Sequence, residues 1–146
     1  MLRPKILVLA FAAAAASPLA AQTPDTCTVA HVLDGDTLHC ADGRRVRLLL
    51  VDAPDAGRFG SVARRALATL TPAGTQITLE TDAVPKDSDG RTLAYVWIGT
   101  DRMVNQVLVR EGFAFFKPSR ENQRYAELLR AAEREARNEH RGVWTR

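Results

Sequence analysis

A tight-turn signal, Asp34-Gly35, lies near the start of the chain between strand-forming residues and limits how the chain can fold. Gly and Asp tolerate the positive φ that tight hairpins demand, so the pattern predicts two short antiparallel strands joined at this turn. A second signal of the same kind, Asp42-Gly43, predicts that a third strand folds back on the second. The chain therefore begins its folded part as a three-stranded meander, predicted over residues 28–33, 37–41 and 45–51.

The third of these strands ends in acidic residues. Its apolar run, residues 46–51, reads as a central strand, and it must stop at Pro54, which has no N–H to donate to a strand ladder. Asp52 and Asp55 lie at this strand end, and Asp36 leaves the first hairpin. Asp is common at turns and strand ends for structural reasons alone, so composition leaves a purely structural role open.

Two more strands and three helices complete the prediction. Strands are expected over 76–81 and 92–98, and helices over 61–70, 103–111 and 121–140, from the spacing of their apolar residues. Five short strands with a helix after the third suggest an α+β, mainly β, domain built on a small closed barrel. Periodicity alone leaves α+β sandwiches open.

The first residues have the pattern of a secretory signal peptide. A basic start precedes a short Ala-rich apolar run and a segment of small residues. The run is too short to span a bilayer, so an N-terminal anchor is the weaker alternative. We expect a signal peptide over 1–21, one domain over 22–146, export to the periplasm or the extracellular medium, and a mature form that is not in the membrane.

Net charge does not identify a partner. The chain has 20 Lys and Arg against 17 Asp and Glu, and removal of Arg3 and Lys5 with the signal leaves 18 against 17. Any affinity for phosphate must therefore come from locally placed cations. The candidates are Arg47, Arg58, Arg64, Arg65, Lys86, Arg91 and Lys117.

Cys27 and Cys40 are the two cysteines of the chain, and they bracket the first hairpin. In an oxidising compartment a pair on neighbouring strands predicts a disulfide, with two buried free thiols as the alternative. The chain lacks His and Cys at zinc-ligand spacing, which argues against a soft-metal site. A hard cation such as Ca²⁺ takes oxygen ligands, and Asp36 and Asp52 could supply two of them.

Several separated blocks resemble, in order and rough spacing, the staphylococcal nuclease-like (thermonuclease) family. The resemblance extends over roughly the whole mature chain, to Trp144. It implies a five-stranded OB-fold barrel with three α-helices and a monomeric enzyme that uses Ca²⁺ to hydrolyse DNA and RNA. The blocks are Asp34-Gly35-Asp36-Thr37, residues 47–55, residues 87–95, Met103-Val104-Asn105 and residues 108–112.

By matching position, the resemblance implies roles for particular residues. Asp36 and Asp52 would be metal carboxylates, and the backbone carbonyl of Ala53 could reach the same ion. Arg47 and Arg91 would be catalytic arginines that also bind the phosphate. Asp55 would occupy the place of the catalytic carboxylate, and Lys117 is a further candidate for substrate binding.

The chain departs from the family pattern in three ways. Asp55 stands where the family usually has Glu, and it is one methylene shorter. Ala53 replaces a common Thr. Phe115 and Phe116 occupy positions near the nucleotide that carry Tyr in the staphylococcal enzyme, and the loop after Asp55 is shorter than in that enzyme. The alternative function is therefore a catalytically weak or inactive OB-fold module that binds nucleic acid or protein.

Overall fold

The computed structural model describes residues 1–2 and 22–145. The predicted signal peptide falls almost wholly on residues 3–21, which lie outside the described residues. Among the residues that are described, no helix is long and apolar enough to cross a membrane.

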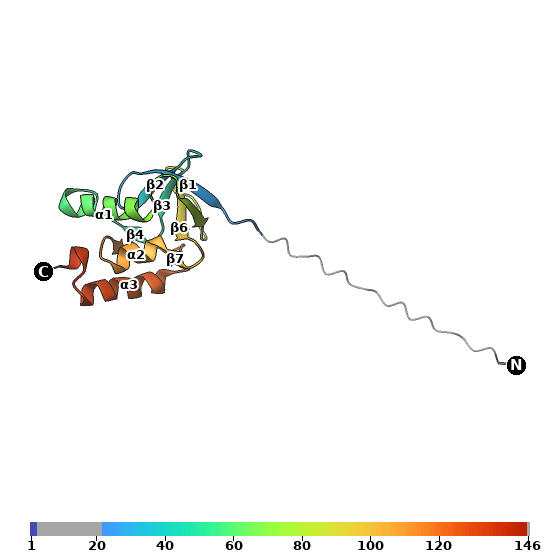
Figure 1. The fold of residues 1–146 in the computed structure, drawn as a ribbon. Coiled ribbons are helices and arrows are strands. Elements are labelled where there is room, and N and C mark those ends of the chain that lie inside the picture. Colours follow the sequence, from blue (N-terminus) through green and yellow to red (C-terminus); the bar gives the residue numbers. More distant parts are fainter. Residues whose placement is uncertain (3–21, 146) are drawn as a thin grey trace.

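Five strands form a closed barrel, as predicted (Figure 1). Neighbouring strands follow the order β3-β2-β1-β5-β6, and a parallel pairing of β3 with β6 closes the cylinder. Inward residues alternate with outward ones along β3 and along β1 as far as Val29, the period-2 pattern that a strand imposes. An irregularity between Val29 and His31 then shifts the register of β1. The strands are β1 (Thr26–Val32), β2 (Thr37–Cys40), β3 (Arg45–Leu48), β5 (Gln76–Glu80) and β6 (Thr92–Ile98).

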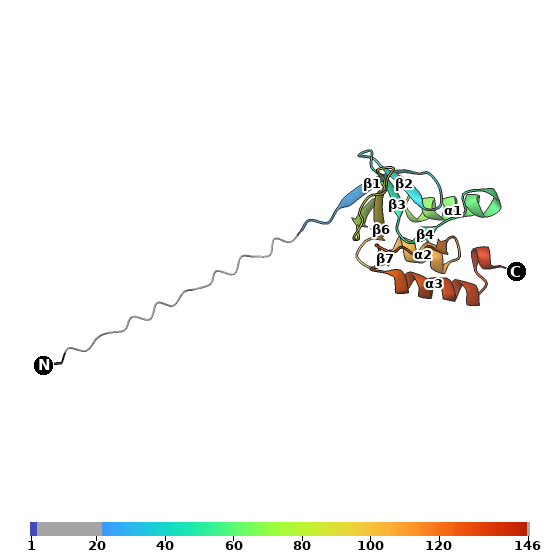
Figure 2. The same ribbon diagram turned by 180° about the vertical axis from the view of Figure 1, so that it is seen from behind.

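Three helices pack against the barrel, also as predicted. Figures 1 and 2 show α2 between α3 and the strands. The helices are α1 (Gly57–Leu70), α2 (Val104–Arg110) and α3 (Ala126–Asn138), followed by the 3₁₀ turn η1 (Gly142–Trp144). Short strands complete the fold: β7 (Arg102–Met103) extends the sheet, and β4 (Val51–Asp52) pairs with β8 (Phe115–Phe116).

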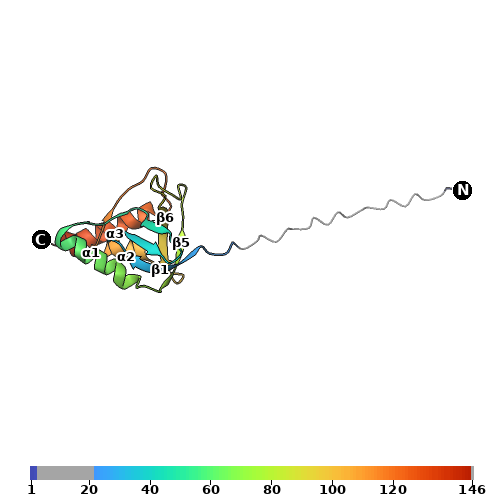
Figure 3. The same cartoon turned by 90° about the horizontal axis from the view of Figure 1, so that it is seen from above.

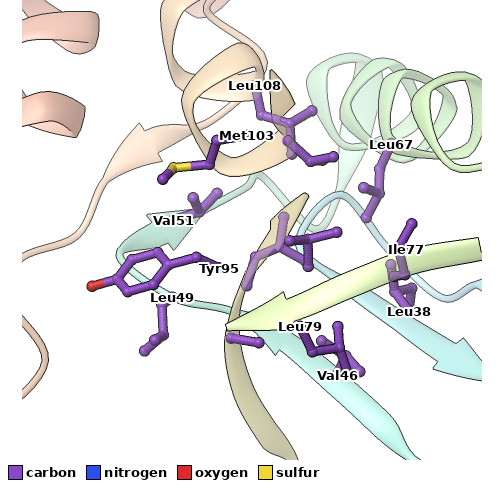
Figure 4. Close-up of a cluster of buried hydrophobic side chains, with 14 of the residues drawn as sticks. Leu38, Val46, Leu49, Val51, Leu67, Ile77, Leu79, Tyr95, Met103 and Leu108 are labelled. Carbon is purple, nitrogen blue, oxygen red and sulfur yellow. The ribbon is translucent and has the colours of Figure 1, made fainter. Parts of the chain in front are cut away.

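The core lies where the barrel interior meets the helices (Figure 4). Leu67 of α1 and Leu108 of α2 are fully buried beside barrel residues such as Leu38 and Ile77. Tyr95 is buried as well, and its hydroxyl donates a hydrogen bond to Asp82 Oδ2 at 2.9 Å. Burial of this apolar surface is the main stabilising contribution to such a domain.

The predicted strand over residues 45–51 is wrong in one respect, because it is interrupted at Leu49-Leu50. Leu50 has φ of 60°, a left-handed conformation that costs a non-glycine residue on the order of 1–3 kcal/mol and persists only where its surroundings impose it. Asn105, fully buried on α2, donates to Leu49 O at 2.9 Å and accepts a hydrogen bond from Val96 N at 2.8 Å. This buried amide holds the bend against the barrel.

The turn signal suggested that Gly35 is needed for a positive φ, but the structure requires a glycine there for a different reason. Its φ is not positive, whereas Gly43 in the second turn has φ of 92° as expected. A Cβ on Gly35 would lie 2.6 Å from the Cβ atoms of both Ala53 and Ala63. Gly35 therefore allows the first hairpin, the segment after β4 and helix α1 to meet.

Cys27 and Cys40 form a disulfide, with 5.7 Å between their Cα atoms. It joins β1 to β2, so the predicted pairing is confirmed in the structure.

The helix boundaries differ more from prediction than the strand boundaries do. Helix α3 starts at Ala126 rather than Glu121, because Asn122 is used to bond both Val84 N and Val84 O.

Candidate active site

Arg47 is the centre of the candidate site. The alternation of β3 turns Val46 and Leu48 inward and leaves Arg47 on the outer face. Its side chain is nevertheless only 13% exposed, because it folds over the bend that follows. Nη1 donates to Leu48 O at 2.8 Å and to Val51 O at 2.7 Å. Arg47 therefore binds main-chain carbonyls on both sides of the Leu49-Leu50 bend.

The other terminal nitrogen of Arg47 meets two carboxylates. Nη2 lies 3.2 Å from Asp36 Oδ2 and 3.4 Å from Asp52 Oδ1. Ala53 N donates to Asp36 Oδ2 at 2.8 Å, which holds the peptide of Ala53 against the same carboxylate. Four of the residues selected from sequence, Asp36, Arg47, Asp52 and Ala53, are thus brought together.

Asp36 and Asp52 differ in their surroundings. The Asp36 side chain is 10% exposed, and burial raises its pKa to about 6, although the Ala53 N–H and the Arg47 charge favour its ionised form. The Asp52 side chain is 52% exposed. Asp36 is therefore a buried carboxylate held by its contacts, and Asp52 beside it faces solvent.

The donor set fits a hard cation that keeps several waters. Both carboxylates converge on one nitrogen, so their oxygens lie close together, and the donors are oxygens alone. Within residues 1–2 and 22–145, no group of three His, Cys, Asp or Glu side chains is placed to hold a metal ion. A bound ion would thus need water and a main-chain carbonyl beside Asp36 and Asp52, which is the set that the sequence suggested.

Arg91 faces the same hollow as Arg47. The hollow has a volume of about 420 Å³, and both arginines and Lys117 line it. Arg91 Nε bonds Asp87 Oδ2 at 2.7 Å, and Asp87 Oδ1 accepts the Arg91 N–H at 3.0 Å. Partial burial opposes ionisation of Asp87, but these bonds from Arg91 outweigh it and lower its pKa. Asp87 therefore positions Arg91 at the end of its loop.

Lys117 and the residues after it form the opposite wall. Lys117 N donates to Leu50 O at 2.9 Å, and its Nζ lies 4.0 Å from Asp52 Oδ1 in a side chain that is 62% exposed. Asn122 ties this wall to the loop of Arg91 through its two bonds to Val84. Figure 3 shows the two segments side by side.

Asp55 is not joined to this cluster. It is exposed, and within the described part of the chain its carboxylate makes no hydrogen bond or ion pair. It lines a separate hollow with Asp34, Arg64 and Arg65. Of the residues to which the family resemblance gave metal, catalytic or substrate roles, Asp55 is the one that lies apart from this cluster. Of the other candidate cations, Arg64 and Arg65 line the hollow of Asp55, and Arg58 and Lys86 line neither hollow.

Sequence reasoning gave no role to two residues that position the site. Asp87 anchors Arg91, and Asn105 holds the bend beneath Arg47. The signal for Asp87 is an Asp followed by Asp89-Gly90-Arg91, a pattern in which the first carboxylate can bond backbone N–H groups two residues on and beyond. Asn105 carries no such local signal, because its partners lie on other elements.

Comparisons with known proteins identify relatives of this chain. Residues 45–146 match the family described as staphylococcal nuclease homologue. A thermonuclease of Staphylococcus intermedius is 38% identical over 81% of this chain and 75% of its own length. A thermonuclease of Staphylococcus hyicus is 34% identical over 82% and 76%. Endonuclease YhcR of Bacillus subtilis (strain 168) is 31% identical over 80% of this chain, which matches 11% of that larger protein.

Proposed function

Since the chain belongs to the staphylococcal nuclease family and is therefore a nuclease, we propose that it is an exported, Ca²⁺-dependent endonuclease that hydrolyses phosphodiester bonds of DNA and RNA. The observation that carries the proposal is the convergence of Asp36 and Asp52 on Arg47, with Arg91 lining the same hollow. Two carboxylates for a cation and two arginines for a phosphate are the groups that this reaction needs.

The arginines would neutralise the phosphate. A phosphodiester resists attack because its negative charge repels nucleophiles, and forked guanidinium donors stabilise the more charged transition state. Arg47 Nη2 is shared between two carboxylates, so a phosphate oxygen can replace one of these bonds without moving the Nη1 contacts. Arg91 is fixed to Asp87 through Nε, so that bond does not use its two terminal nitrogens, which could contact the phosphate.

A hard divalent cation on Asp36, Asp52 and the Ala53 carbonyl would act as a Lewis acid beside the phosphate. Lys117 would add positive charge at the open wall. Asp55 is the candidate for accepting the proton of the attacking water, and its carboxylate is free to move because it is exposed. A carboxylate must come within about 2.6–3.2 Å of that water, so Asp55 has to turn towards the cluster when substrate binds.

Export follows from two features. Residues 1–21 have the pattern of a signal peptide, and the Cys27–Cys40 disulfide is of a kind that persists in oxidising compartments. We therefore assign residues 22–146 to the mature domain, which acts as a monomer outside the membrane, in the periplasm or the medium.

The sequence also suggested a binding module with weak or no catalysis. The position of Asp55, in a hollow separate from that of Arg47, favours low turnover. The cluster of two carboxylates, Asp36 and Asp52, with Arg47 and with Arg91 in the same hollow favours cleavage.

Digestion of labelled single-stranded DNA and RNA by the purified protein tests the proposal. We expect both to be cut within the chain in Ca²⁺ and neither to be cut in excess chelator. The Asp101→Ala variant, which removes an exposed carboxylate outside the site, should behave as wild type. Binding of both nucleic acids with no cleavage under any condition would support the binding module instead.

A further inference from the structure

A second hollow adjoins the candidate active site. Its volume is about 400 Å³, and it shares one residue, Arg91, with the hollow that contains Arg47 and Lys117. A polymer bound across Arg91 would therefore continue from one hollow into the other. The second hollow is lined by Leu33, Thr37, His39, Arg45, Asp89 and Arg91.

Strand register explains why the two hollows lie next to each other. Arg45 and Arg47 are two residues apart on β3, so both leave the same face of the barrel. Directly opposite on β2, Thr37 pairs with Arg47 and His39 pairs with Arg45. The outer face of this hairpin thus carries two neighbouring cross-strand pairs. Arg47 lines the active-site hollow, whereas Thr37, His39 and Arg45 line the second hollow.

The second hollow offers a cation. Arg45 makes no ion pair among the residues that the structure describes, and one of its nitrogens donates to the main-chain oxygen of Asp89. The remaining guanidinium donors are free for an anion. The Asp89 side chain is 70% exposed at the rim and lies 4.0 Å from Arg91 Nη2, so its charge is partly offset there.

The same hollow offers a surface for a flat apolar group. Leu33 is 53% exposed beside the turn of the first hairpin, so its apolar side chain is accessible to a ligand. The His39 ring packs against His31, with 4.5 Å between ring centroids, and this fixes it as a wall. His39 Nε2 is buried and has no hydrogen-bond partner in the described structure.

We propose that this hollow is a subsite for an unpaired nucleotide flanking the scissile phosphate, with Arg45 on its phosphate and Leu33 and His39 against its base. The inference rests on the proposed nuclease function. Proteins bind single strands through such combinations of cationic groups and platforms for exposed bases. In a duplex the faces of the bases are stacked on one another, so the subsite favours single-stranded substrate.

Equilibrium binding tests this subsite without relying on catalysis. Fluorescence anisotropy in excess chelator measures the affinity for a labelled single-stranded 12-mer and for the same 12-mer as a duplex. Arg45→Ala should weaken binding of the single strand about tenfold and lower the slope of log K against log salt by roughly 0.7, the value for one phosphate contact on a single strand. Arg45→Lys should restore most of the slope. Leu33→Ala, which leaves the Arg45 contact to Asp89 intact, should reduce the preference for the single strand.

Arg102→Ala is the matched control, because Arg102 is exposed and lines a hollow that shares no residue with either of these two. It should keep the wild-type affinity and slope. Arg45→Ala with wild-type affinity and slope would overturn the subsite, and so would equal weakening for duplex and single strand. If these binding changes occur while wild-type protein cleaves nothing in Ca²⁺, the subsite stands and the proposed catalytic function fails.

Discussion

Arg47 combines two roles that are separate in many active sites. It bonds two main-chain carbonyls around the Leu49-Leu50 bend and faces two carboxylates with its other terminal nitrogen. A lysine could supply the charge but not this fork, because its ammonium is a point charge. In the proposed mechanism, catalysis and local structure would therefore both depend on one planar side chain.

Arg47→Ala should lower turnover on single-stranded DNA by about two to three orders of magnitude, the scale seen when one oriented transition-state donor is lost. It should also lower the free energy of unfolding by about 2 kcal/mol, since buried partners of a charged group lose their bonds. Single-turnover cleavage and urea unfolding measure the two effects. Arg134→Ala, at an exposed position of α3, is the control. Near-normal cleavage by a folded Arg47→Ala protein would remove Arg47 from the mechanism.

Asp55 provides a test in the opposite direction. Its carboxylate is one methylene shorter than the Glu that the family pattern has there, and Pro54 limits how far the backbone can move to compensate. We expect Asp55→Glu to raise kcat in saturating Ca²⁺ and Asp55→Ala to lower it. A slower Asp55→Glu enzyme would mean that the native backbone already delivers the shorter side chain. An Asp55→Ala enzyme as fast as wild type would exclude Asp55 from the chemistry.

At the scale of elements, the site depends on how β3 ends. Strand β3 runs straight to Leu48, and the chain then bends through Leu50 before β4 begins at Val51. Asn105 fixes Leu49 from α2, and Leu49 N bonds Ala94 O on β6. The bend turns Asp52 back towards Arg47, so a contact in the core sets the geometry of a surface site.

Asn105→Ala should lower the free energy of unfolding by about 3 kcal/mol, because Leu49 O and Val96 N lose their buried partner. Activity should fall as well, since the bend positions Arg47. Asn138→Ala, an exposed asparagine at the end of α3, should change neither quantity by much. Chemical unfolding of both variants checks this, and an Asn105→Ala protein as stable as wild type would show that the amide does not hold the bend.

Local patterns predicted the elements but not this bend. Runs of strand-forming residues between turn signals were sufficient to predict β1, β2, β5 and β6. Apart from Arg47, the run from 46 to 51 is apolar, so it gave no sign that Leu50 leaves the strand. The bend is imposed by Asn105 and Arg47, whose partners are known only in three dimensions. Asp36, Asp52 and Arg47 could be chosen from sequence because they match the motifs of the family. That Asp55 lines a separate hollow could not be predicted, because its neighbours there are known only in three dimensions.

At the scale of the whole molecule, a small barrel with a single core is stabilised by its closure and by one covalent link. The parallel pairing of β3 with β6 removes the free edges of the sheet. The disulfide joins β1 to β2 next to the hairpin that carries Asp36. Stability and the placement of Asp36, a proposed metal ligand, are thus coupled through the first hairpin.

Replacing both Cys27 and Cys40 with Ala should lower the free energy of unfolding by roughly 3 kcal/mol in the chain-entropy view of a short closed loop. Thermal or urea unfolding of the exported protein and of the double variant measures this. Thiol titration of denatured, unreduced wild-type protein should find no free thiol. Two free thiols in exported protein would contradict the pairing in solution.

In the proposed mechanism, Asp36, Asp52 and Arg47 form the centre of a Ca²⁺-dependent phosphodiester hydrolase. The most direct test is the initial rate of single-stranded DNA cleavage as a function of Ca²⁺ concentration, for wild-type protein and for Asp36→Asn. We predict a saturable dependence on Ca²⁺ for wild type and a rate at least about a hundredfold lower for Asp36→Asn, the scale expected for loss of one charge-stabilising group. Cleavage that persists in chelator, or an Asp36→Asn protein with the wild-type rate and Ca²⁺ dependence, would contradict the claim.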